Sequence, residues 1–388
     1  MPLNARRQAQ RYHADFLSRE DFAAVVRRGG RVPLPRGFFL SGYWMDAWLA
    51  TLPRATAPCL LVLSDDDGAT VASAGITLRR RWRFGVLPRR IAFVNETGDP
   101  TLDRLTIEDN GLADAGGGAS TDPDAYRVLV QACEHSDEVV LRNVAKGVAT
   151  AIEALDGPAC RIVRSGVEQR PYVDLDALRG EGSNDPCAAH LAILSRNTRQ
   201  GLRRTRRLYA SRGPLTLRRA HTVAEAHSFL EQLAALHQAT WQGRGFSGAF
   251  ASPFFLAFHR ALIDRAFDAG VIDLLRIDAG DHCVGYLYNF VFGGWVHNYQ
   301  SGFAYQADNR LRPGLLCHHL AIADALDRGH RVYDMLGGGA RYKHSLCNAS
   351  EALYSYRLLA PTSAGRAEWL IETAKRAILS RLGRTDPP

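Results

Sequence analysis

The stretch YNFVFGGWVHNYQSGFAYQADNRLRPGLLCHHL, residues 288–320, decides the fold that we expect for this chain. Two aromatic, apolar runs meet at Gly293 and Gly294, which predicts a tight hairpin of two strands over 283–303. A polar loop then leads into a helix that should begin near Gly314. Hairpin, loop and helix in this order predict an antiparallel meander with a helix packed on it.

The neighbouring residues extend this unit in both directions. The strands expected beside it are VIDLLRI (271–277) before the hairpin, and RVYDML (331–336) and LYSYRLL (353–359) after the helix. Three helices should precede the meander: one long helix from Asp185 to Gly213, one that begins with the capping box Thr222–Glu225, and one from Ser252 to Gly270. A basic amphipathic helix, AEWLIETAKRAILSRL, should close the chain.

The first half of the chain shows a weaker form of the same order. The expected strands are 58–64, 71–78, 89–94, 138–144, a strand near 160–164 and 170–175, and the expected helices are 123–133 and 146–155. We therefore expect an α/β (α+β) fold of two related lobes with a polar linker at 178–186. The predicted domains are 1–178, 179–361 and a C-terminal basic helix and tail at 362–388.

Length and composition describe a soluble globular protein. The 388 residues suffice for two cores, and 46% of them are hydrophobic and 23% charged. No apolar run approaches the roughly 20 residues that span a bilayer, and the first residues lack the apolar core of a secretory signal, so we expect a cytoplasmic protein. The net charge of +8 favours acidic partners such as phosphorylated cofactors, nucleotide-linked substrates, nucleic acid or an anionic membrane, without choosing among them.

The cysteines form neither a disulfide nor a metal pattern. Seven are scattered singly, with no C-x-x-C pair, which is typical of reduced thiols in a cytosolic protein. The run Cys317-His318-His319 looks like a ligand cluster, but adjacent residues on a helix point in different directions and cannot converge on one ion. We predict no metal site.

A second glycine-rich segment, HRVYDMLGGGARYKHSLC (330–347), invites comparison with a phosphate-binding loop. That motif requires Gly-Lys-Ser/Thr at the start of a helix. Here Tyr342 precedes Lys343, His344 follows it, and the chain is expected to continue into a strand. The spacing and the context exclude a phosphate loop, and the glycines are expected to form a flexible turn that positions Tyr342 and Lys343.

A better phosphate site lies where the helix near Gly314 begins. Backbone N–H groups and the dipole at a helix start favour a pyrophosphate, and the loop before this helix carries two arginines. A glycine there lets a ligand approach the backbone closely. The candidate residues are Arg310, Leu311, Arg312, Gly314 and Leu315. An ordinary helix start is the alternative interpretation.

Basic and aromatic residues on two helices are further candidates for ligand contacts. The run SRNTRQGLRRTRRLYASR puts Arg203 among arginines on one helix face, which is either a solvated surface or a docking surface for an anion. His237 and Trp241 lie one turn apart, just before the glycine-rich turn that carries Arg244, and His237 is either structural or catalytic.

The aromatic residues of the hairpin divide into core and ligand candidates. Alternation along the first strand places Tyr286, Tyr288 and Phe290 on one face, where they should be core. Tyr299 and Gln300, near the end of the second strand, are the better candidates to touch a ligand.

Five segments, taken in order, resemble the Fem-like branch of the GNAT acyltransferase superfamily, and within it the CelD-like acetyltransferases of polysaccharide biosynthesis. They are SRNTRQGLRRTRRLYASRGPL (195–215), LHQATWQGRGFSGAF (236–250), YNFVFGGWVHNYQSGF (288–303), RLRPGLLCHH (310–319) and YDMLGGGARYKHSL (333–346). The resemblance covers about the last half of the chain, and FVNETGDPTLDRLTIEDNGL (93–112) looks like the accompanying lobe. It implies tandem GNAT-like lobes, each with a mixed, mostly antiparallel sheet flanked by helices.

The resemblance implies an N-acyltransferase, an acetyltransferase in particular. Its co-substrate is acyl-CoA (acetyl-CoA), and its acceptor is an amine of a sugar or amino-acid-like small molecule, with a nucleotide-linked sugar as one candidate. The loop departs from the superfamily's Arg/Gln-x-x-Gly-x-Gly/Ala pattern, because only Pro313-Gly314 is present, and this leaves the donor open.

Two alternatives remain. One is an aminoacyl-tRNA-dependent Fem-type ligase that forms peptide bonds with tRNA as a partner; such ligases often carry a coiled-coil arm, and no long heptad run occurs here. The other is a non-catalytic protein that uses its basic helices on membrane or polysaccharide machinery. The sequence does not indicate an oligomeric state.

Attack of an amine on a thioester needs a base for the amine and donors for the oxyanion, but no enzyme nucleophile. Asp334 and His237 are the candidate bases, although Asp334 is equally interpreted as a buried cap for the glycine turn. Tyr342 and Lys343 match the aromatic–lysine pair at the reaction centre of Fem ligases, which implies that Lys343 stabilises negative charge or orients the acceptor. The predicted catalytic residues are Asp334, Lys343 and His237, and the predicted substrate contacts are Trp241, Arg244, Tyr299, Gln300, Tyr342 and Arg203.

Overall fold

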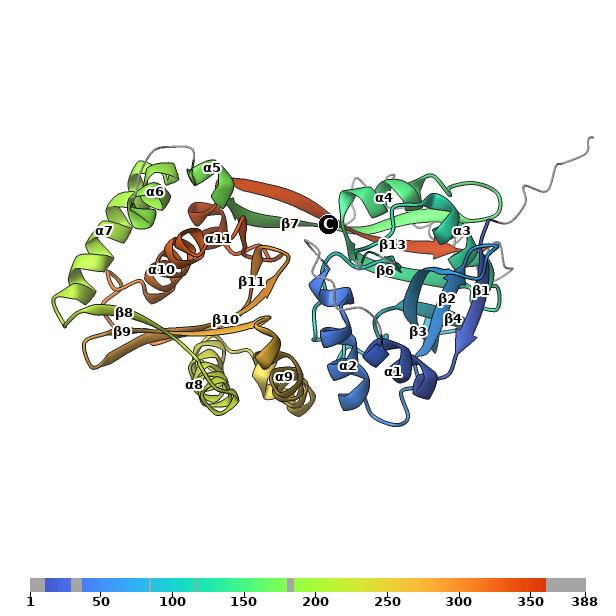
Figure 1. Ribbon diagram of the computed structural model, residues 1–388, viewed down its shortest axis with the longest axis horizontal. Helices are drawn as coiled ribbons and strands as arrows, with labels where there is room; N and C mark the ends of the chain where they lie inside the picture. Colours follow the sequence, from blue (N-terminus) through green and yellow to red (C-terminus); the bar gives the residue numbers. More distant parts are fainter. Residues whose placement is uncertain are drawn as a thin grey trace, which may run out of the picture.

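The computed structural model describes residues 11–28, 37–83, 85–114, 116, 118–179 and 185–360. Within these residues 13 strands form one sheet, in the order β1-β2-β3-β4-β6-β13-β7-β12-β11-β10-β9-β8 with β5 beside β3. Figure 1 shows the sheet as two lobes joined by the long strands β7 and β13. The predicted linker residues 180–184 and the predicted C-terminal helix at 362–388 lie outside the described residues.

The first lobe contains a three-stranded meander and the helices around it. Its elements are β1 (His13–Leu17), α1 (Arg19–Arg28), η1 (Phe38–Leu40), α2 (Gly42–Thr51), β2 (Cys59–Ser64), β3 (Thr70–Arg83), β4 (Leu87–Val94), β5 (Ala113–Asp114), α3 (Pro123–Ala132), β6 (Glu138–Val144), α4 (Lys146–Glu153) and β7 (Arg161–Asp174). The two strands predicted near 160–164 and at 170–175 are a single strand, β7.

The second lobe repeats the plan with longer helices. Its elements are α5 (Leu175–Arg179), α6 (Pro186–Ile193), α7 (Arg196–Ala210), β8 (Leu215–Arg219), α8 (Val223–Gln242), η2 (Ala249–Ala251), α9 (Pro253–Ala266), η3 (Phe267–Ala269), β9 (Ile272–Ala279), β10 (His282–Phe292), β11 (Trp295–Phe303), α10 (Pro313–Asp327), β12 (Val332–Asp334), α11 (Arg341–Leu346) and β13 (Ala349–Leu359). In Figure 1, α8 and α9 cover one face of its meander, and α10, α6 and α7 lie on the other.

Both lobes follow the same topology. Each has an antiparallel meander, then a helix, then a short strand that runs parallel to the last meander strand, then a second helix and a long strand. The parallel pairs are β4 with β6 in the first lobe and β11 with β12 in the second. The predicted fold class, two related α/β lobes with mixed, mostly antiparallel sheets, is confirmed.

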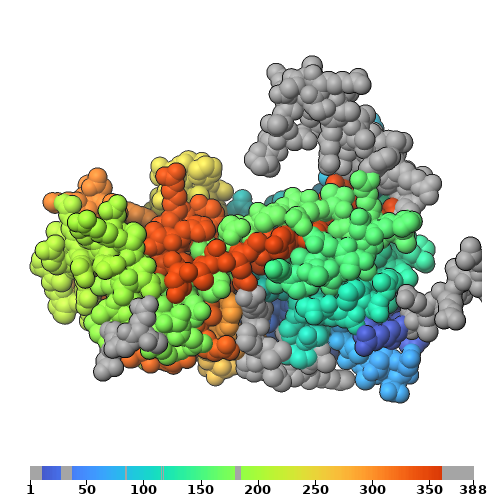
Figure 2. Space-filling model, turned by 90° about the horizontal axis from the view of Figure 1, so that it is seen from above, coloured from blue at the N-terminus to red at the C-terminus, as the bar shows by residue number. Residues whose placement is uncertain are grey.

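The two long strands are exchanged between the lobes. β7, which follows the first lobe, pairs with β12 of the second, and β13, which ends the second lobe, pairs with β6 of the first. β7 and β13 also pair with each other over 11 residues, which places Arg170 opposite Glu351. Figure 2 shows the red strand β13 running across the molecule from one lobe to the other. The domain limits at 178 and 361 stay a prediction. The predicted second domain ends with β13, and this strand pairs with β6 of the first lobe.

One hydrophobic core crosses from lobe to lobe. Phe38 of η1 stacks on Phe290 of β10, with ring centroids 4.2 Å apart, and meets Trp44 of α2 edge-on. Trp44 in turn meets Phe258 of α9 edge-on at 4.6 Å. All four side chains are buried. Tyr286, Tyr288 and Phe290 all belong to this core, so their predicted burial is confirmed.

The predicted single helix from Asp185 to Gly213 is wrong, because the chain forms two helices, α6 and α7. Leu194 is extended, with ψ 149°, and the Thr198 N–H donates to the Ser195 Oγ at 3.3 Å. A serine hydroxyl that accepts from the backbone starts a new helix at the expense of the old one. Both helices still pack on α10, so the apolar stripe continues across the break.

The segment after the three glycines also differs from its prediction. Residues Arg341–Leu346 form a short helix, α11, before the chain enters β13. Tyr342 and Lys343 therefore lie on a helix, and the context argument against a phosphate loop fails. The spacing argument stands by itself, since Tyr342 takes the place of the required glycine.

Replacing Phe38 by Ala should destabilise the protein by about 3–5 kcal/mol, because it leaves a cavity in the core that both lobes share. The shift in the urea midpoint, followed by circular dichroism and tryptophan fluorescence, measures the effect. Phe16→Ala is the matched control, since the Phe16 side chain on β1 is 47% exposed, and should change the midpoint little. Equal shifts for the two variants would contradict a shared core.

Candidate active site

A cavity of about 570 Å³ opens where β11 and β12 separate. The two strands pair in parallel over only three residues, Trp295–His297 with Val332–Asp334, and β11 then continues to Phe303. The cavity walls come from β11, the end of α8, the loop after β12, α11 and a segment of the first lobe. The lining residues are Thr106, Glu108, His237, Thr240, Trp241, Arg244, Asn298, Tyr299, Gln300, Ser301, Phe303, Tyr305, Leu336, Gly337, Gly338, Gly339, Ala340, Tyr342 and Lys343.

The loop after β12 is held by the carboxylate of Asp334. Asp334 is fully buried; its Oδ1 accepts the Leu336 N–H at 2.8 Å, and its Oδ2 lies 2.9 Å from His297 Nδ1. Leu336 has φ 56°, a left-handed conformation that is costly for a residue with a side chain and needs such support. Burial alone would raise the pKa of Asp334, but the charge of Arg170 and the His297 contact outweigh it and keep this pKa below its usual value.

Lys343 reaches back from α11 onto this loop. Its Nζ donates to the carbonyl oxygens of Gly337, at 2.6 Å, and Leu336, at 3.3 Å. Burial lowers the pKa of Lys343, although nearby carboxylates, Glu108 first, oppose the shift. An ammonium group has three N–H donors, so two are directed to the loop and one is left for a ligand in the cavity.

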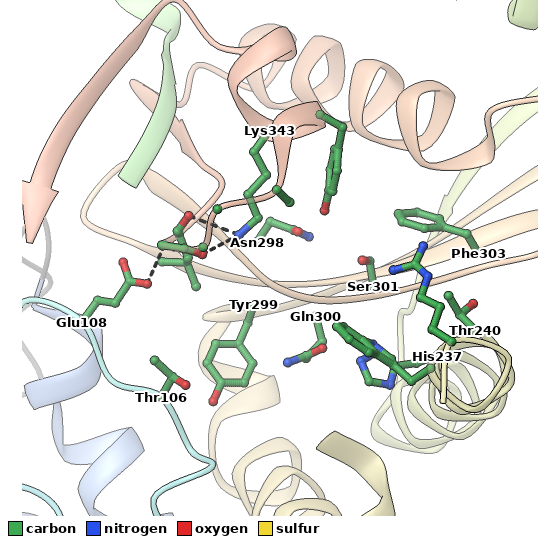
Figure 3. Close-up of a pocket in the computed structure, with 18 of the residues that line it drawn as sticks. Thr106, Glu108, His237, Thr240, Asn298, Tyr299, Gln300, Ser301, Phe303 and Lys343 are labelled. Atoms are coloured by element: carbon green, nitrogen blue, oxygen red, sulfur yellow. Dashed lines mark hydrogen bonds between the residues drawn. The ribbon is translucent and has the colours of Figure 1, made fainter. Parts of the chain in front are cut away.

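Glu108 contacts the same loop from the first lobe. Its Oε1 accepts the Gly337 N–H at 2.7 Å, and its Oε2 has no hydrogen-bond partner among the described residues. Burial, together with the negative charge of Asp334, raises the pKa of Glu108 to about 8. Figure 3 shows Glu108 and Lys343 joined by hydrogen bonds to one loop, which lies between them. A carboxyl group and an ammonium group thus flank a single peptide at the edge of the cavity.

Glu108 is absent from the residues that the sequence predicts for the site. The only signal is an acidic pair, Glu108-Asp109, placed between the apolar residues Ile107 and Leu112. Its partner, Gly337, lies 229 residues further along the chain, and no local pattern indicates that contact.

Arg170, on the exchanged strand β7, carries the positive charge behind these carboxyl groups. Its guanidinium is fully buried and donates to both carboxylate oxygens of Asp109, at 2.6 and 3.1 Å, and from Nε to Glu351 at 3.0 Å. Glu108 Oε2 and Asp334 Oδ2 lie 3.6 and 3.9 Å from its Nη1. One cation therefore faces four acidic groups. The pKa of Glu108 is raised first by burial and then by the negative charge of Asp334, and Arg170 only partly opposes the shift.

The opposite end of the cavity is formed by the end of α8. Figure 3 shows His237 beside Thr240 there, away from Glu108 and Thr106. The ring of His237 is tilted against that of Trp241, with centroids 5.9 Å apart. Burial lowers the pKa of His237, so its imidazole is neutral at pH 7. Arg244, one turn beyond, lies 5.7 Å from the Trp241 ring.

The structure brings seven of the sequence-predicted residues together and leaves the others outside the cavity. The seven in the lining are His237, Trp241, Arg244, Tyr299, Gln300, Tyr342 and Lys343. Asp334 lies beneath the loop and not in the lining. Arg203 faces a separate cleft beside α7.

The five predicted phosphate-binding residues lie at the start of α10. Arg310 pairs with Asp308 at 2.7 Å, Arg312 is exposed, and Leu311 and Leu315 are buried. A Cβ on Gly314 would lie 3.1 Å from the ring of Phe303, which lines the cavity. The helix therefore starts at the edge of the cavity, and no side chain caps it.

The described part of the chain shows neither a metal cluster nor a membrane span. It contains no group of three His, Cys, Asp or Glu side chains that could hold a metal ion. Cys317, His318 and His319 point to different neighbours: His319 meets His190, and His318 stacks on Tyr342. None of the helices in that part is long and apolar enough to cross a membrane.

The second half of the chain is similar to a known domain family. Residues 196–344, from α7 to α11, match the family model for the acetyltransferase (GNAT) domain. FemX is similar over 90% of this chain and 98% of its own, with a TM-score of 0.54 and 10% identity. The second half of the chain thus has the GNAT acetyltransferase-domain fold, and at this identity the likeness to FemX shows the fold alone.

Two other solved structures cover most of the chain with lower scores. A tandem GNAT protein from the clavulanic acid biosynthesis pathway covers 90% of this chain and 99% of its own, with a TM-score of 0.43 and 12% identity. L-PGS from Bacillus licheniformis covers 88% of this chain and 92% of its own, with a TM-score of 0.47 and 13% identity. No curated protein sequence matches the chain.

Replacing Arg170 by Gln should lower the free energy of unfolding by about 3–5 kcal/mol at neutral pH, because it leaves buried carboxylates without their counter-ion. The charge of Arg170 is the main cause that holds the folded-state pKa of Asp334 below its usual value, so without Arg170 burial raises this pKa. The loss should therefore grow as the pH rises from about 4 to 7.

Urea unfolding at several pH values measures this dependence. Arg164→Gln is the control on the same strand, since the Arg164–Glu153 pair is exposed and should contribute little. A deficit for Arg170→Gln that does not change with pH would contradict the charge argument.

Proposed function

We propose that the protein is an N-acyltransferase, an acetyltransferase in particular, of the CelD-like group within the Fem-like branch. It would act in the cytoplasm and transfer an acyl group from acyl-CoA to the amine of a sugar or amino-acid-like small molecule, free or linked to a nucleotide. The observation that supports it most is the pairing of Lys343 and Glu108 on one loop of a cavity at the split between β11 and β12.

Lys343 is suited to stabilise the oxyanion of the tetrahedral intermediate. Its ammonium is held by the Gly337 and Leu336 carbonyls, so the remaining N–H is oriented before a substrate arrives. A donor that is already in place costs no reorganisation when negative charge develops on the acyl oxygen. Tyr342, the aromatic member of the pair, is stacked on His318 and fixes one side of α11.

Glu108 is suited to take the proton from the acceptor. With its pKa at about 8 the group exchanges a proton near neutral pH, and Oε2 is the atom without a hydrogen-bond partner. As the amine nitrogen bonds to the acyl carbon, its proton passes to Glu108 and the carbon–sulfur bond breaks. The proton on Glu108 is then available to the leaving thiolate. His237 stays a second candidate base, and Asp334 is better placed to position the loop.

The start of α10 is the candidate site for the pyrophosphate of the acyl donor. No side chain caps the start of α10, and Gly314 in its first turn lies beside Phe303, at the cavity edge, with Arg312 at the N-cap position. An aminoacyl-tRNA is the alternative donor, because FemX shares the fold over 98% of its own chain. Both donors present an activated carbonyl, so Lys343 and Glu108 would serve either reaction.

The test is thiol release from acetyl-CoA and longer acyl-CoAs in the presence of amino sugars, amino acids and their nucleotide-linked forms. We expect turnover with at least one pair, and Lys343→Met should lower kcat by about 10²–10³ with little change in KM, since the lysine acts on the transition state.

Arg341→Met is the matched control, because Arg341 is an exposed cation on the same helix and does not line the cavity. It should keep wild-type activity. If no acyl-CoA turns over or protects the protein against heat, while an aminoacyl-tRNA does, the acyl-CoA proposal is wrong and the alternative holds.

The pH profile identifies the base. For the wild-type protein kcat/KM should rise with pH and level off above the Glu108 pKa of about 8, because only the carboxylate accepts a proton. Glu108→Gln should lower kcat/KM by about 10²–10⁴ and abolish this limb. His237→Gln should leave the limb in place.

The acceptor amine also titrates, so the profile needs a second acceptor with a different amine pKa. A limb that stays at the same pH for both acceptors belongs to the protein. A limb that moves with the acceptor, or that persists in Glu108→Gln, would assign the titration to the substrate.

A further inference from the structure

A second cleft, of about 450 Å³, lies on the outer side of α10 between α6 and α7. Figure 2 shows the yellow-green helices α6 and α7 exposed at one end of the molecule. The lining residues are Leu191, Leu202, Arg203, Arg206, Arg207, Ala210 and His319. None of them lines the cavity at β11, so this cleft is a separate feature of the surface.

Three arginines on α7 border this cleft. Arg203, Arg206 and Arg207 are three and four residues apart, so they share one face of the helix. All three are exposed, and none has a hydrogen bond or ion pair with another described residue. Like charges held together without counter-ions repel one another, and guanidinium groups pair best with phosphate or carboxylate oxygens. The rest of the wall is apolar, from Leu191, Leu202 and Ala210.

A buried histidine pair lies at the base of the cleft. His190 Nε2 is 3.0 Å from the Leu346 carbonyl oxygen, and His190 Nδ1 is 2.8 Å from His319 Nδ1. A carbonyl only accepts, so His190 carries its proton on Nε2 and uses Nδ1 as the acceptor from His319. Burial lowers the pKa of both rings, to about 4 and about 3, so both are neutral.

These tautomers leave His319 Nε2 with a free lone pair. The His319 side chain is 0% exposed, and its Nε2 has no partner in the described part of the chain. An unsatisfied buried acceptor is costly, and its place in the wall of a cleft indicates a hydroxyl donor from outside. The cleft thus offers cations at its rim, an apolar wall and one acceptor at its base.

We propose that this cleft binds a phosphate monoester that carries an apolar group. The phosphate oxygens would pair with the arginines, the apolar group would lie on Leu191, Leu202 and Ala210, and a hydroxyl of the ligand would donate to His319 Nε2. A lipid-like alkyl phosphate and a nucleoside phosphate share this chemistry. The inference concerns a second site and does not rest on the proposed reaction.

The site is connected to the helix that carries Lys343. Leu346, whose carbonyl accepts the hydrogen bond from His190 Nε2, is the last residue of α11. A ligand that donates to His319 would strengthen the hydrogen bonds along His319, His190 and Leu346. Occupancy of the cleft should therefore stabilise α11 against local opening, which hydrogen exchange of its amides reports.

Calorimetric titration of the full chain with decyl phosphate, adenosine 5′-monophosphate and inorganic phosphate tests the site. We expect at least one ester to bind about tenfold or more tightly than inorganic phosphate, through the apolar wall. Tighter binding of decyl phosphate would identify the ligand as a lipid-like alkyl phosphate, and tighter binding of adenosine 5′-monophosphate would identify it as a nucleoside phosphate. Saturating acetyl-CoA should not displace it, and Lys343→Met should bind it as the wild type does.

Arg203→Gln/Arg207→Gln should weaken the tighter ester about tenfold or more, because two charge-assisted contacts are lost. Arg196→Gln/Arg204→Gln is the matched control, with the same change of charge on exposed positions of the same helix outside the cleft. Equal losses in both variants, no preference for an ester, or displacement by acetyl-CoA would each overturn the proposal.

Discussion

The burial of one guanidinium group, that of Arg170, is the constraint on which the arrangement of the two lobes depends. It contacts Asp109 from the first lobe and Glu351 from β13, and it lies 3.9 Å from Asp334 of the second lobe. A buried cation of this kind is tolerated only where carboxylates surround it, so these segments must meet at one point. The exchange of β7 and β13 brings them there, since the two strands place Arg170 directly opposite Glu351.

The same charge balance determines the chemistry at the cavity. Arg170 is close enough to keep Asp334 ionised, and ionised Asp334 holds the left-handed turn at Leu336 that presents both polar groups of Gly337. The Gly337 carbonyl then holds Lys343, and its N–H holds Glu108. Glu108 is buried beside the negative charge of Asp334, and these two effects together outweigh the charge of Arg170, so Glu108 retains its proton to higher pH. A structural ion cluster and a candidate base are thus parts of one network.

The parts that the sequence predicts are those with local causes. Gly293 and Gly294 force a tight turn between apolar runs, and Pro313 with Gly314 starts a helix, so the meander and α10 are predicted near their true limits. The apolar stripe alone predicts one continuous helix. Ser195 breaks it, because its hydroxyl caps the start of α7. The role of Lys343 is predicted from the resemblance of the sequence to Fem ligases. Glu108 and Arg170 depend on contacts over 229 and 181 residues, for which periodicity and spacing contain no information.

The two lobes share a topology but use its split strands differently. In the first lobe β4 and β6 separate as β11 and β12 do in the second. The space between the separated strands of the first lobe is filled by residues 95–112 of the chain itself. Asn95 Nδ2 donates to Asn110 Oδ1 at 2.9 Å, and Asn143 Nδ2 donates to the Ile107 carbonyl at 3.0 Å. Because these amides fix the segment 95–112 in the first split, Glu108 projects from it into the second. The first lobe therefore contributes a rigid support for one carboxyl group, and the cavity for a ligand remains in the second.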